Sequence, residues 1–240
     1  MDVTDRSSGQ PDEKYLRPSE CINSDHPAVV ELAASLLEAN AAETDIDKAL
    51  SLYYWCRDKV RYNPYALGDT RDAMSASATL AAGEGWCVPK AALLAALCRA
   101  AGIPARVGFA DVRNHLSTER MREAMNTDVF YFHGYTSIYL EGKWVKATPA
   151  FNIELCDKFG LHALEFNGRD DSLYHEFDQA GNKHMEYLHD RGEYLDIPFD
   201  EMMAVFREHY PYMLPDTAQA SSSLDASSWD EDVEAEVFGS

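Results

Sequence analysis

The most constraining feature of the sequence is a stretch, residues 91–101, that consists almost entirely of alanine and leucine. Pro89 suits the first turn of a helix, where a missing N–H costs nothing. Gly102 suits the left-handed position that follows a helix, and Pro104 marks the stop. A helix that is apolar nearly all round must be buried. The sequence therefore predicts a central helix that the rest of the chain covers.

Composition allows such a core and excludes several classes of protein. The 240 residues are 46% hydrophobic and 11% aromatic, which fits one domain with an appendage and rules out wholesale disorder. The net charge of −20 opposes binding to nucleic acid, because phosphates would be repelled. No apolar run is long enough to span a membrane, and the polar first residues do not have the pattern of a secretory signal, so we expect neither feature. Five cysteines without a CxxC pair are typical of reduced thiols in a cytoplasmic protein.

Three segments of different character divide the chain. Residues 1–20 are polar and are predicted to be a flexible N-terminal segment. Residues 21–215 carry the periodic hydrophobic patterns and form the predicted folded domain. Residues 216–240 contain seven acidic residues, many serines and no lysine or arginine, so we expect a disordered acidic tail.

Within the domain, helical patterns come first and strand patterns follow. Spacing of apolar residues predicts helices at 26–40, 45–60, 77–82 and 200–210. Aromatic and β-branched residues predict strands at 105–112, 129–140 and 143–147. The last two strands are separated by Glu141 and Gly142 and should form a hairpin. The polar segment 157–198 is predicted to be mostly loop, with a helix near 183–191.

Cys87 lies where the central helix is expected to begin. Unpaired backbone N–H groups and the positive end of the helix dipole both stabilise a thiolate there. They should lower the pKa of the thiol and provide a nucleophile, and the same N–H groups can donate to an oxyanion. Gly85 and Trp86 allow a tight turn and supply an aromatic wall. The alternative is a small buried hydrophobe, which is our interpretation of Cys98.

Several motifs in residues 45–150 together carry a family resemblance. They are VRYNPY at 60–65, ATLAAGEGWC at 78–87, the helix and strand of 91–107, and HGYTSIYLEGKW at 133–144. The chain resembles the transglutaminase-like superfamily, a papain-related group of cysteine enzymes. The resemblance implies an α+β, papain-like fold. In that fold a helical lobe packs on an antiparallel β-sheet, with the nucleophile at a helix N-terminus.

The family uses a catalytic triad of Cys, His and Asp in chain order, and this sequence matches two of the three. Cys87 and His133 match the nucleophile and the base. Thr148 precedes Pro149 at the position where the family has Asp. A threonine hydroxyl can accept a hydrogen bond from the imidazole but cannot stabilise an imidazolium by charge. Three alternatives remain: Thr148 suffices, another side chain orients His133, or the site is degenerate. The candidates near in sequence for the second alternative are Asn152, Asp128 and Asp157.

The resemblance implies cysteine-dependent acyl transfer at an amide through a thioester, as in an amidase, a peptidase or a transglutaminase. A peptide or amide substrate would lie between the lobes, against Trp86, Tyr131 and Tyr135, and no cofactor is expected. A degenerate binding domain is the alternative. The histidine-rich segment 175–189 offers a third hypothesis, a metal site. His184 and His189 are about 140° apart around a helix, however, so we expect no metal there.

Overall fold

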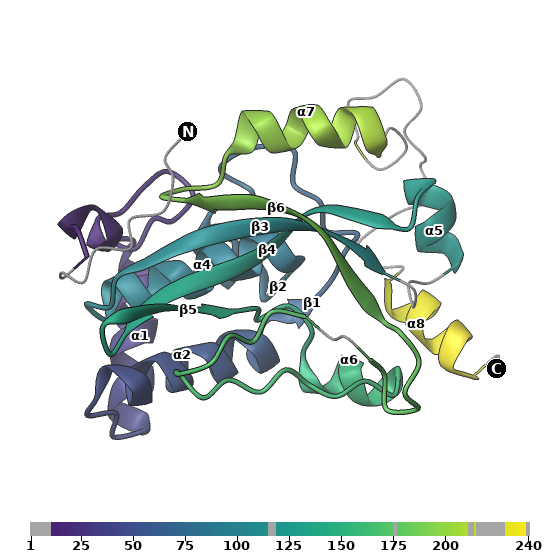
Figure 1. Ribbon diagram of the computed structural model, residues 1–240. Coiled ribbons are helices and arrows are strands. Elements are labelled where there is room, and N and C mark those ends of the chain that lie inside the picture. The colour runs from purple at the N-terminus through teal and green to yellow at the C-terminus, as the bar shows by residue number, and fades with distance from the viewer. Residues whose placement is uncertain (1–10, 115–118, 175–176, 211–213, 215–228, 239–240) are drawn as a thin grey trace.

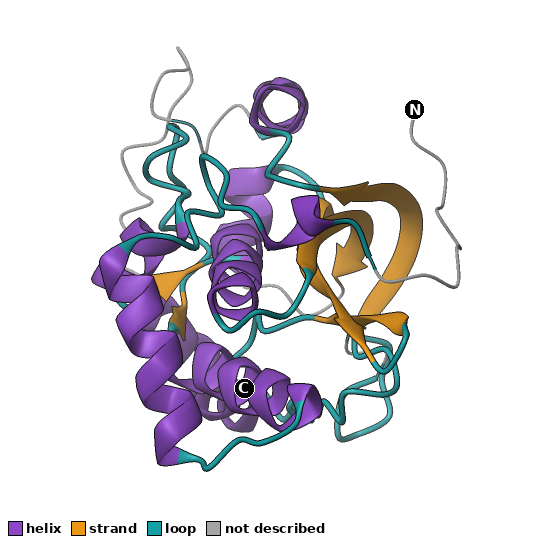
Figure 2. Cartoon of the chain, turned by 90° about the vertical axis from the view of Figure 1, so that its left-hand side faces the viewer, coloured by secondary structure: helices purple, strands orange, loops and turns teal. Residues whose placement is uncertain are grey.

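The computed structural model describes residues 11–114, 119–174, 177–210, 214 and 229–238 of the chain. Helices gather on one side of the molecule and a curved β-sheet lies on the other (Figure 2). The fold is therefore α+β, as the sequence predicts. The boundary expected at residue 20 lies within the described part of the chain, whereas the boundary expected at residue 215 lies outside it, and both stay predictions.

The helical side is built around one buried helix. Its elements are η1 (Glu13–Leu16), α1 (Pro27–Ala39), α2 (Asp45–Lys59), α3 (Ala76–Ala82) and α4 (Cys87–Ala100). Every residue of α4 from Cys87 to Arg99 is buried. Helices α1, α2 and α3 pack against one side of α4, while β3 and β4 of the main sheet pack against the other. The prediction of a central helix is confirmed, and its apolar surface is the core that joins the two layers.

The strands form a short parallel pair and a larger antiparallel sheet. The pair is β1 (Arg61–Tyr62) and β2 (Glu84–Gly85). The sheet contains β3 (Ala105–Asn114), β4 (Val129–Leu140), β5 (Lys143–Ala147) and β6 (Met185–Tyr194), in the order β5-β4-β3-β6. Glu141 and Gly142 join β4 to β5 with φ values of 48° and 87°. Two positive φ values suit a tight hairpin turn, so the predicted hairpin is confirmed.

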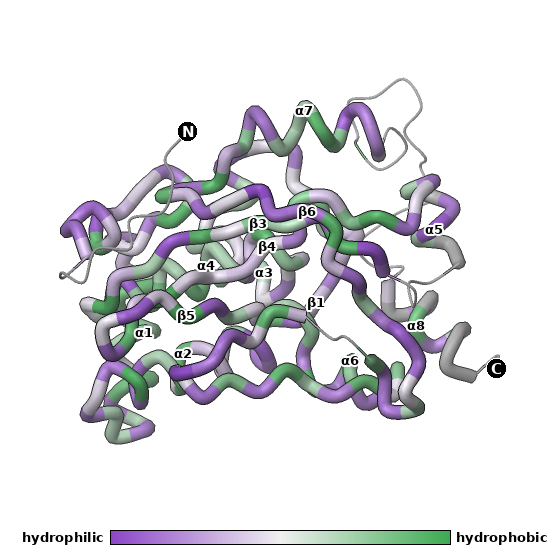
Figure 3. Tube along the Cα trace, in the orientation of Figure 1, coloured by the Kyte–Doolittle hydropathy of each residue, from purple (hydrophilic) through white to green (hydrophobic). Residues whose placement is uncertain are grey.

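The remaining helices surround the end of the sheet where β4 begins. They are α5 (Glu119–Met125), α6 (Ile153–Lys158), α7 (Phe199–His209) and α8 (Trp229–Phe238). In Figure 1, α7 runs beside β6, whereas α5 and α8 lie together at one end of the molecule. Hydrophobic and hydrophilic stretches alternate along α7 (Figure 3), and its buried residues are Met202, Met203 and Phe206. This helix therefore covers the sheet with one face only.

The C-terminal third of the domain differs from the prediction. The helix predicted near 183–191 is wrong, because these residues belong to strand β6 and its approach. Bulges in β6 interrupt its alternation of polar and apolar residues, so a strand pattern is missing from the sequence.

The chain ends also contain structure that composition did not predict. Residues 229–238, in the segment expected to be disordered, form α8. Its Trp229 is buried and meets the Tyr65 ring edge-on, with the ring centroids 5.4 Å apart. Near the other end, Tyr15 of η1 meets the Trp144 ring in the same way, at 4.9 Å. Among the described helices, none is both long and apolar enough to cross a membrane.

Candidate active site around Cys87 and His133

Cys87 is the first residue of α4, and a close-packed turn delivers the chain to it. Trp86 takes the N-cap position with an extended backbone. Gly85 pairs with Tyr62 in the short parallel sheet. A Cβ atom on Gly85 would lie 3.2 Å from the Thr79 side chain and 3.3 Å from the Pro89 ring. Glycine at this position therefore lets α3 and the start of α4 approach each other closely enough to aim Cys87 at the sheet.

The electrostatic surroundings of Cys87 contain two opposing effects. Backbone N–H groups of Gly134, Val88 and Cys87 itself form hydrogen bonds to the sulfur and lower the pKa of the thiol. Burial outweighs them and raises the pKa to about 11. The expectation of a lowered thiol pKa is therefore wrong for the buried sulfur of this structure, because desolvation penalises the thiolate. The N–H groups at the helix N-terminus do lower the pKa of the thiol, but they offset only part of the rise that burial causes.

The other four cysteines show how much those N–H groups contribute. Burial raises the pKa values of Cys21, Cys56 and Cys156 to about 12 and that of Cys98 further still. Cys87 and Cys98 are both buried and lie on the same helix. The pKa of Cys87 is raised less, because its sulfur receives backbone N–H groups. Among the five thiols, Cys87 is therefore the one most easily converted to a thiolate.

His133 and Cys87 line the same cavity. It has a volume of about 40 Å³, which is room for a few water molecules. His133 lies on β4, directly before Gly134. A Cβ atom on Gly134 would lie 2.9 Å from the Cα of Val88, so only glycine lets β4 pass this close to the first turn of α4. The structure thus brings together the two residues that the sequence singled out.

Trp86 and Tyr131 also line this cavity, as expected, but Tyr135 does not. Tyr135 lies over Gly108 of β3, where an added Cβ atom would fall 2.2 Å from its ring. The ammonium of Lys146 sits 4.9 Å above the same ring. Tyr135 therefore packs on the sheet instead of forming a wall of the cavity. The other walls, which the sequence reasoning missed, are Tyr62, Pro64, Leu67, Met121, Met125, Phe130, Phe206 and Tyr210.

Helix α7 is fastened to β4 beside the cavity. The hydroxyl of Tyr210 donates to the carbonyl of Val129 at 2.8 Å and accepts from the N–H of Tyr131 at 2.6 Å. His209 stacks on the ring of Tyr131, with ring centroids 4.1 Å apart. Only 4% of Cys87 and 5% of His133 are exposed. Cys87 and His133 are therefore almost fully buried, and residues of α5, α7 and the segment after β1 line the cavity beside them.

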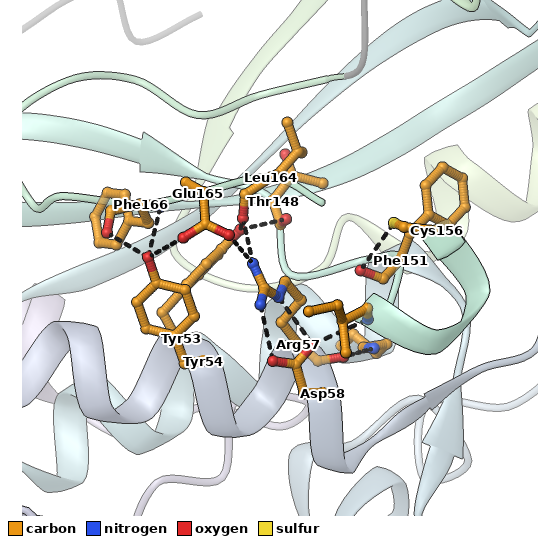
Figure 4. Close-up of polar contacts among 12 residues, drawn as sticks. Tyr53, Tyr54, Arg57, Asp58, Thr148, Phe151, Cys156, Leu164, Glu165 and Phe166 are labelled. Carbon is orange, nitrogen blue, oxygen red and sulfur yellow. Dashed lines mark hydrogen bonds and ion pairs between the residues drawn. The ribbon is translucent and has the colours of Figure 1, made fainter. Parts of the chain in front are cut away.

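Thr148 follows β5, and its backbone is held firmly. Its N–H donates to the carbonyl of Ser172, and its own carbonyl accepts from the hydroxyl of Tyr53 (Figure 4). The same tyrosine hydroxyl contacts the carbonyl of Leu164, which also accepts from Arg57. The side-chain hydroxyl of Thr148 is buried and has no hydrogen-bond partner among the described residues. Among the described residues, therefore, the structure does not contain the hydrogen bond between Thr148 and the imidazole that the first of the three alternatives requires.

The other candidates for orienting His133 have different partners. Asn152 is buried, and its Oδ1 accepts from the N–H of Tyr62 at 3.1 Å. Asp128 is half-exposed and forms an ion pair with Nε of Arg113 at 3.0 Å. Asp157 is exposed on α6. Asn152 thus positions a wall of the cavity, Asp128 belongs to a surface ion pair, and a role for either in orienting the imidazole stays a prediction.

Comparison with known proteins agrees with this geometry. A sequence model described as the transglutaminase-like superfamily matches residues 31–149, a span that contains Cys87, His133 and Thr148. The chain belongs to the transglutaminase-like superfamily. Comparison with curated protein sequences found no match.

One similar solved structure is described as a candidate cysteine protease from Cytophaga hutchinsonii. It is 20% identical, with a TM-score of 0.42. The match covers 75% of this chain but 53% of that protein, so this chain spans about half of its length.

Membership of the transglutaminase-like superfamily raises the question of which residue takes the place of the third member of the triad, the aspartate. The resemblance places Thr148 at the aspartate position of the family, and none of the described residues that line the cavity has a carboxylate. The only ionisable side chains there are those of Cys87, His133, Tyr62, Tyr131 and Tyr210. In the described state, therefore, no negative charge at the cavity wall would stabilise an imidazolium.

The histidine-rich segment does not form a metal centre within the part of the chain that is described. No group of three or more His, Cys, Asp or Glu side chains there is placed to hold a metal ion. His184 is buried and stacks on Phe151, with ring centroids 6.1 Å apart. His189 lies on β6, whereas His175 is outside the described residues.

Proposed function

We propose that the protein catalyses acyl transfer at an amide, with Cys87 as nucleophile and His133 as general acid and base. The observation that carries this proposal is that both side chains line one cavity, at the N-terminus of a buried helix. Backbone N–H groups already directed at the sulfur support it further. The same kind of group stabilises an oxyanion during acyl transfer. Membership of a superfamily of cysteine enzymes agrees with this assignment.

In the first step, His133 takes the proton of the Cys87 thiol, and the sulfur attacks the amide carbonyl carbon. The carbonyl oxygen becomes an oxyanion, which accepts a hydrogen bond from the backbone N–H of Cys87. When the tetrahedral intermediate collapses, the C–N bond breaks and His133 gives its proton to the departing amine. The acyl group is left on Cys87 as a thioester.

In the second step, an acceptor releases the acyl group. Water loses a proton to His133 and attacks the thioester, the C–S bond breaks, and the thiolate recovers the proton. We propose hydrolysis of a peptide or amide, although a lysine amine in place of water would produce a cross-link. The net charge of −20 favours a neutral or cationic substrate over an anionic one.

The proposal is tested by the reactivity of the thiols toward iodoacetamide at pH 7, followed by peptide mapping. We expect Cys87 to be alkylated at least about tenfold faster than the other four cysteines, because its thiolate is stabilised by backbone N–H groups and by His133. His133→Ala should remove most of this difference. Cys98 is the matched internal control, since it lies on the same buried helix.

Two results would overturn the proposal. One is alkylation of Cys87 at the same rate as Cys98 in the intact protein. The other is a fast rate that His133→Ala leaves unchanged, since the imidazole would then have no part in activating the sulfur.

A non-catalytic binding domain is the second candidate function. The observations that favour it are the burial of Cys87 and His133, the raised pKa of Cys87, and the hydroxyl of Thr148, which has no hydrogen-bond partner among the described residues. A domain of this kind would keep the cavity as a ligand site without forming a thioester. It predicts slow alkylation of Cys87 together with intact folding of the Cys87→Ala variant, so the same experiment separates the two functions.

A further inference from the structure

The strand that carries His133 contains an irregularity immediately before it. Ala110 of β3 pairs with His133, and Val112 pairs with Phe130. Two steps along β3 therefore correspond to three steps along β4, which places one extra residue on β4 between these pairs. Phe132 has a φ of 56°. This conformation is rare for a bulky side chain and costs energy unless the surroundings enforce it.

The carboxylate of Asp111 holds this bulge in place. Asp111 lies on β3 and is 6% exposed. Its Oδ1 accepts a hydrogen bond from the N–H of Phe132 at 3.1 Å. That N–H faces the carboxylate because of the positive φ of Phe132, so the side chain of one strand supplies the hydrogen bond that regular pairing would have given.

Arg191 completes the arrangement from the opposite side. It donates from Nε to the same Oδ1 of Asp111, and its guanidinium lies 4.2 Å from the centre of the Phe132 ring. Ala110 pairs with Asp190, and Phe109 pairs with Gly192, so Arg191 is itself an extra residue on β6. Asp111 thus lies between bulges on both of its neighbouring strands and contacts a residue of each.

This arrangement determines the direction of His133. An extra residue in a strand exchanges the faces on which the following side chains lie. Burying a carboxylate costs free energy, and pairing it with a guanidinium often does no more than offset that cost. The pair of Asp111 and Arg191 is therefore better explained by the backbone geometry that it holds than by a gain in stability. The chain segment they hold ends at His133, which lines the same cavity as Cys87, and at Gly134, whose backbone N–H reaches the sulfur of Cys87.

We propose that Asp111 and Arg191 are positioning residues: they lock the bulge at Phe132 and thereby aim the imidazole of His133 at Cys87. This inference rests on the proposed function, because it assigns these residues a part in activating the sulfur. It also explains why a strained conformation stands directly beside the candidate base. Neither residue lines the cavity, so neither is expected to touch a substrate.

The test measures the rate of Cys87 alkylation by iodoacetamide between pH 5 and 10 in the full-length protein and in three variants. Asp111→Ala removes both hydrogen bonds and should slow alkylation at pH 7 by about tenfold to a hundredfold, since a misplaced catalytic group costs that much. Its rate should then rise only at high pH, like that of an isolated thiol. Asp111→Asn keeps an acceptor for Phe132 and should restore part of the neutral-pH rate. Arg191→Gln should resemble Asp111→Ala, with a smaller effect.

The matched control is Glu193→Gln. Glu193 of β6 forms an ion pair with Arg106 of β3, so it joins the same two strands without reaching the bulge. Its rate and pH profile should equal those of the unaltered protein. Circular dichroism and thermal unfolding check that each variant is folded. If Asp111→Ala does not fold, Asp111→Asn and Arg191→Gln decide the matter.

The outcomes separate this inference from the proposed function. If the unaltered protein shows no alkylation that depends on His133, the proposed function fails. The other case is that alkylation of Cys87 depends on His133, but the folded Asp111 and Arg191 variants keep the rate and pH profile of the Glu193→Gln control. The two residues then only stabilise the sheet, and the inference is overturned.

Discussion

The first turn of α4 carries two buried polar side chains with opposite surroundings. Lys90 points to α2 and is fully enclosed, and its Nζ donates to the carbonyls of Arg57 and Val60. These carbonyls lie at the C-terminal end of α2, where the last carbonyl groups of a helix have no N–H partner within the helix. The ammonium therefore caps a neighbouring helix, and every contact it makes serves the fold.

Cys87, on the other side of the same turn, faces a cavity whose polar atoms are incompletely paired. The indole N–H of Trp86, a residue that lines this cavity, is buried without a hydrogen-bond partner among the described residues. Native proteins seldom leave such groups unpaired, and an exception calls for an explanation. The two sides of this turn therefore differ: the ammonium of Lys90 is paired within the fold, whereas the indole N–H beside Cys87 is available to a ligand.

The largest effect should come from removing the sulfur. Cys87→Ala is expected to lower the rate of peptide amide cleavage by at least about a thousandfold, because no thioester can form. The free energy of unfolding should change by less than about 1 kcal/mol, since the sulfur faces a cavity. Mass spectrometry of a pooled peptide substrate and urea unfolding measure the two quantities. Cys98→Ala, in the core of the same helix, should keep the activity and lose stability. Loss of activity in Cys98→Ala together with retained activity in Cys87→Ala would contradict the assignment of Cys87 as the nucleophile.

Replacing Lys90, the paired side chain of the same turn, should lower the free energy of unfolding. Lys90→Met leaves two buried carbonyls without a donor and should lower the free energy of unfolding by about 2 kcal/mol at pH 7. Burial lowers the pKa of Lys90 from 10.5 to about 8. Between these values the unfolded chain holds a proton that the folded chain lacks, so stability contributed by Lys90 rises with pH. The difference between the unaltered protein and the variant should therefore grow from pH 8 to pH 10.5. A constant difference would show that Lys90 is not neutralised by burial.

A smaller effect is expected from restoring the residue of the family. Thr148→Asp places a carboxylate where a threonine hydroxyl now stands, and it should accelerate alkylation of Cys87 at pH 7 by about tenfold. The physical reason is that a negative charge stabilises the imidazolium that forms when His133 takes the thiol proton. Thr148→Asn, which adds no charge, is the control and should give little acceleration. Equal rates for the two variants would show that charge at this position does not reach the imidazole.

The smallest effect concerns the unpartnered hydroxyl itself. Thr148→Val has nearly the same shape and removes a buried group without a partner, so the protein should become more stable by about 0.5–1 kcal/mol. The midpoint of urea unfolding should rise at an unchanged slope. A fall in stability would mean that the hydroxyl gains a hydrogen bond that the described residues do not provide.

Local patterns predicted the parts of the fold whose surroundings are simple. The helix that starts at Cys87 is apolar on every side and is bounded by Pro89 and Gly102, so tertiary contacts only reinforce what the sequence favours. The hairpin at Glu141 and Gly142 follows from turn chemistry in the same way. Bringing Cys87 and His133 together depended on the family resemblance, because no local pattern joins residues that are far apart in the chain.

The missing parts depend on tertiary contacts that no local pattern reveals. Strand β6 contains two extra residues, so its side chains do not alternate and the segment resembles a polar helix. Phe132, which has a positive φ, donates its N–H to a carboxylate from another strand. The raised pKa of Cys87 comes from burial by helices distant in the sequence, which outweighs the local effect of the helix N-terminus. Trp229 could be recognised as an anchor for α8 only once Tyr65 was known to lie beside it.

The tyrosine hydroxyl that fastens α7 to β4 also protects the protein from association. Partner strand β5 pairs with β4 only from Thr136 onward, so the earlier part of β4 would otherwise present a bare edge. Such edges recruit strands from other molecules and promote aggregation. By accepting from the N–H of Tyr131 and donating to the carbonyl of Val129, the single oxygen of Tyr210 occupies the two positions that an incoming strand would use.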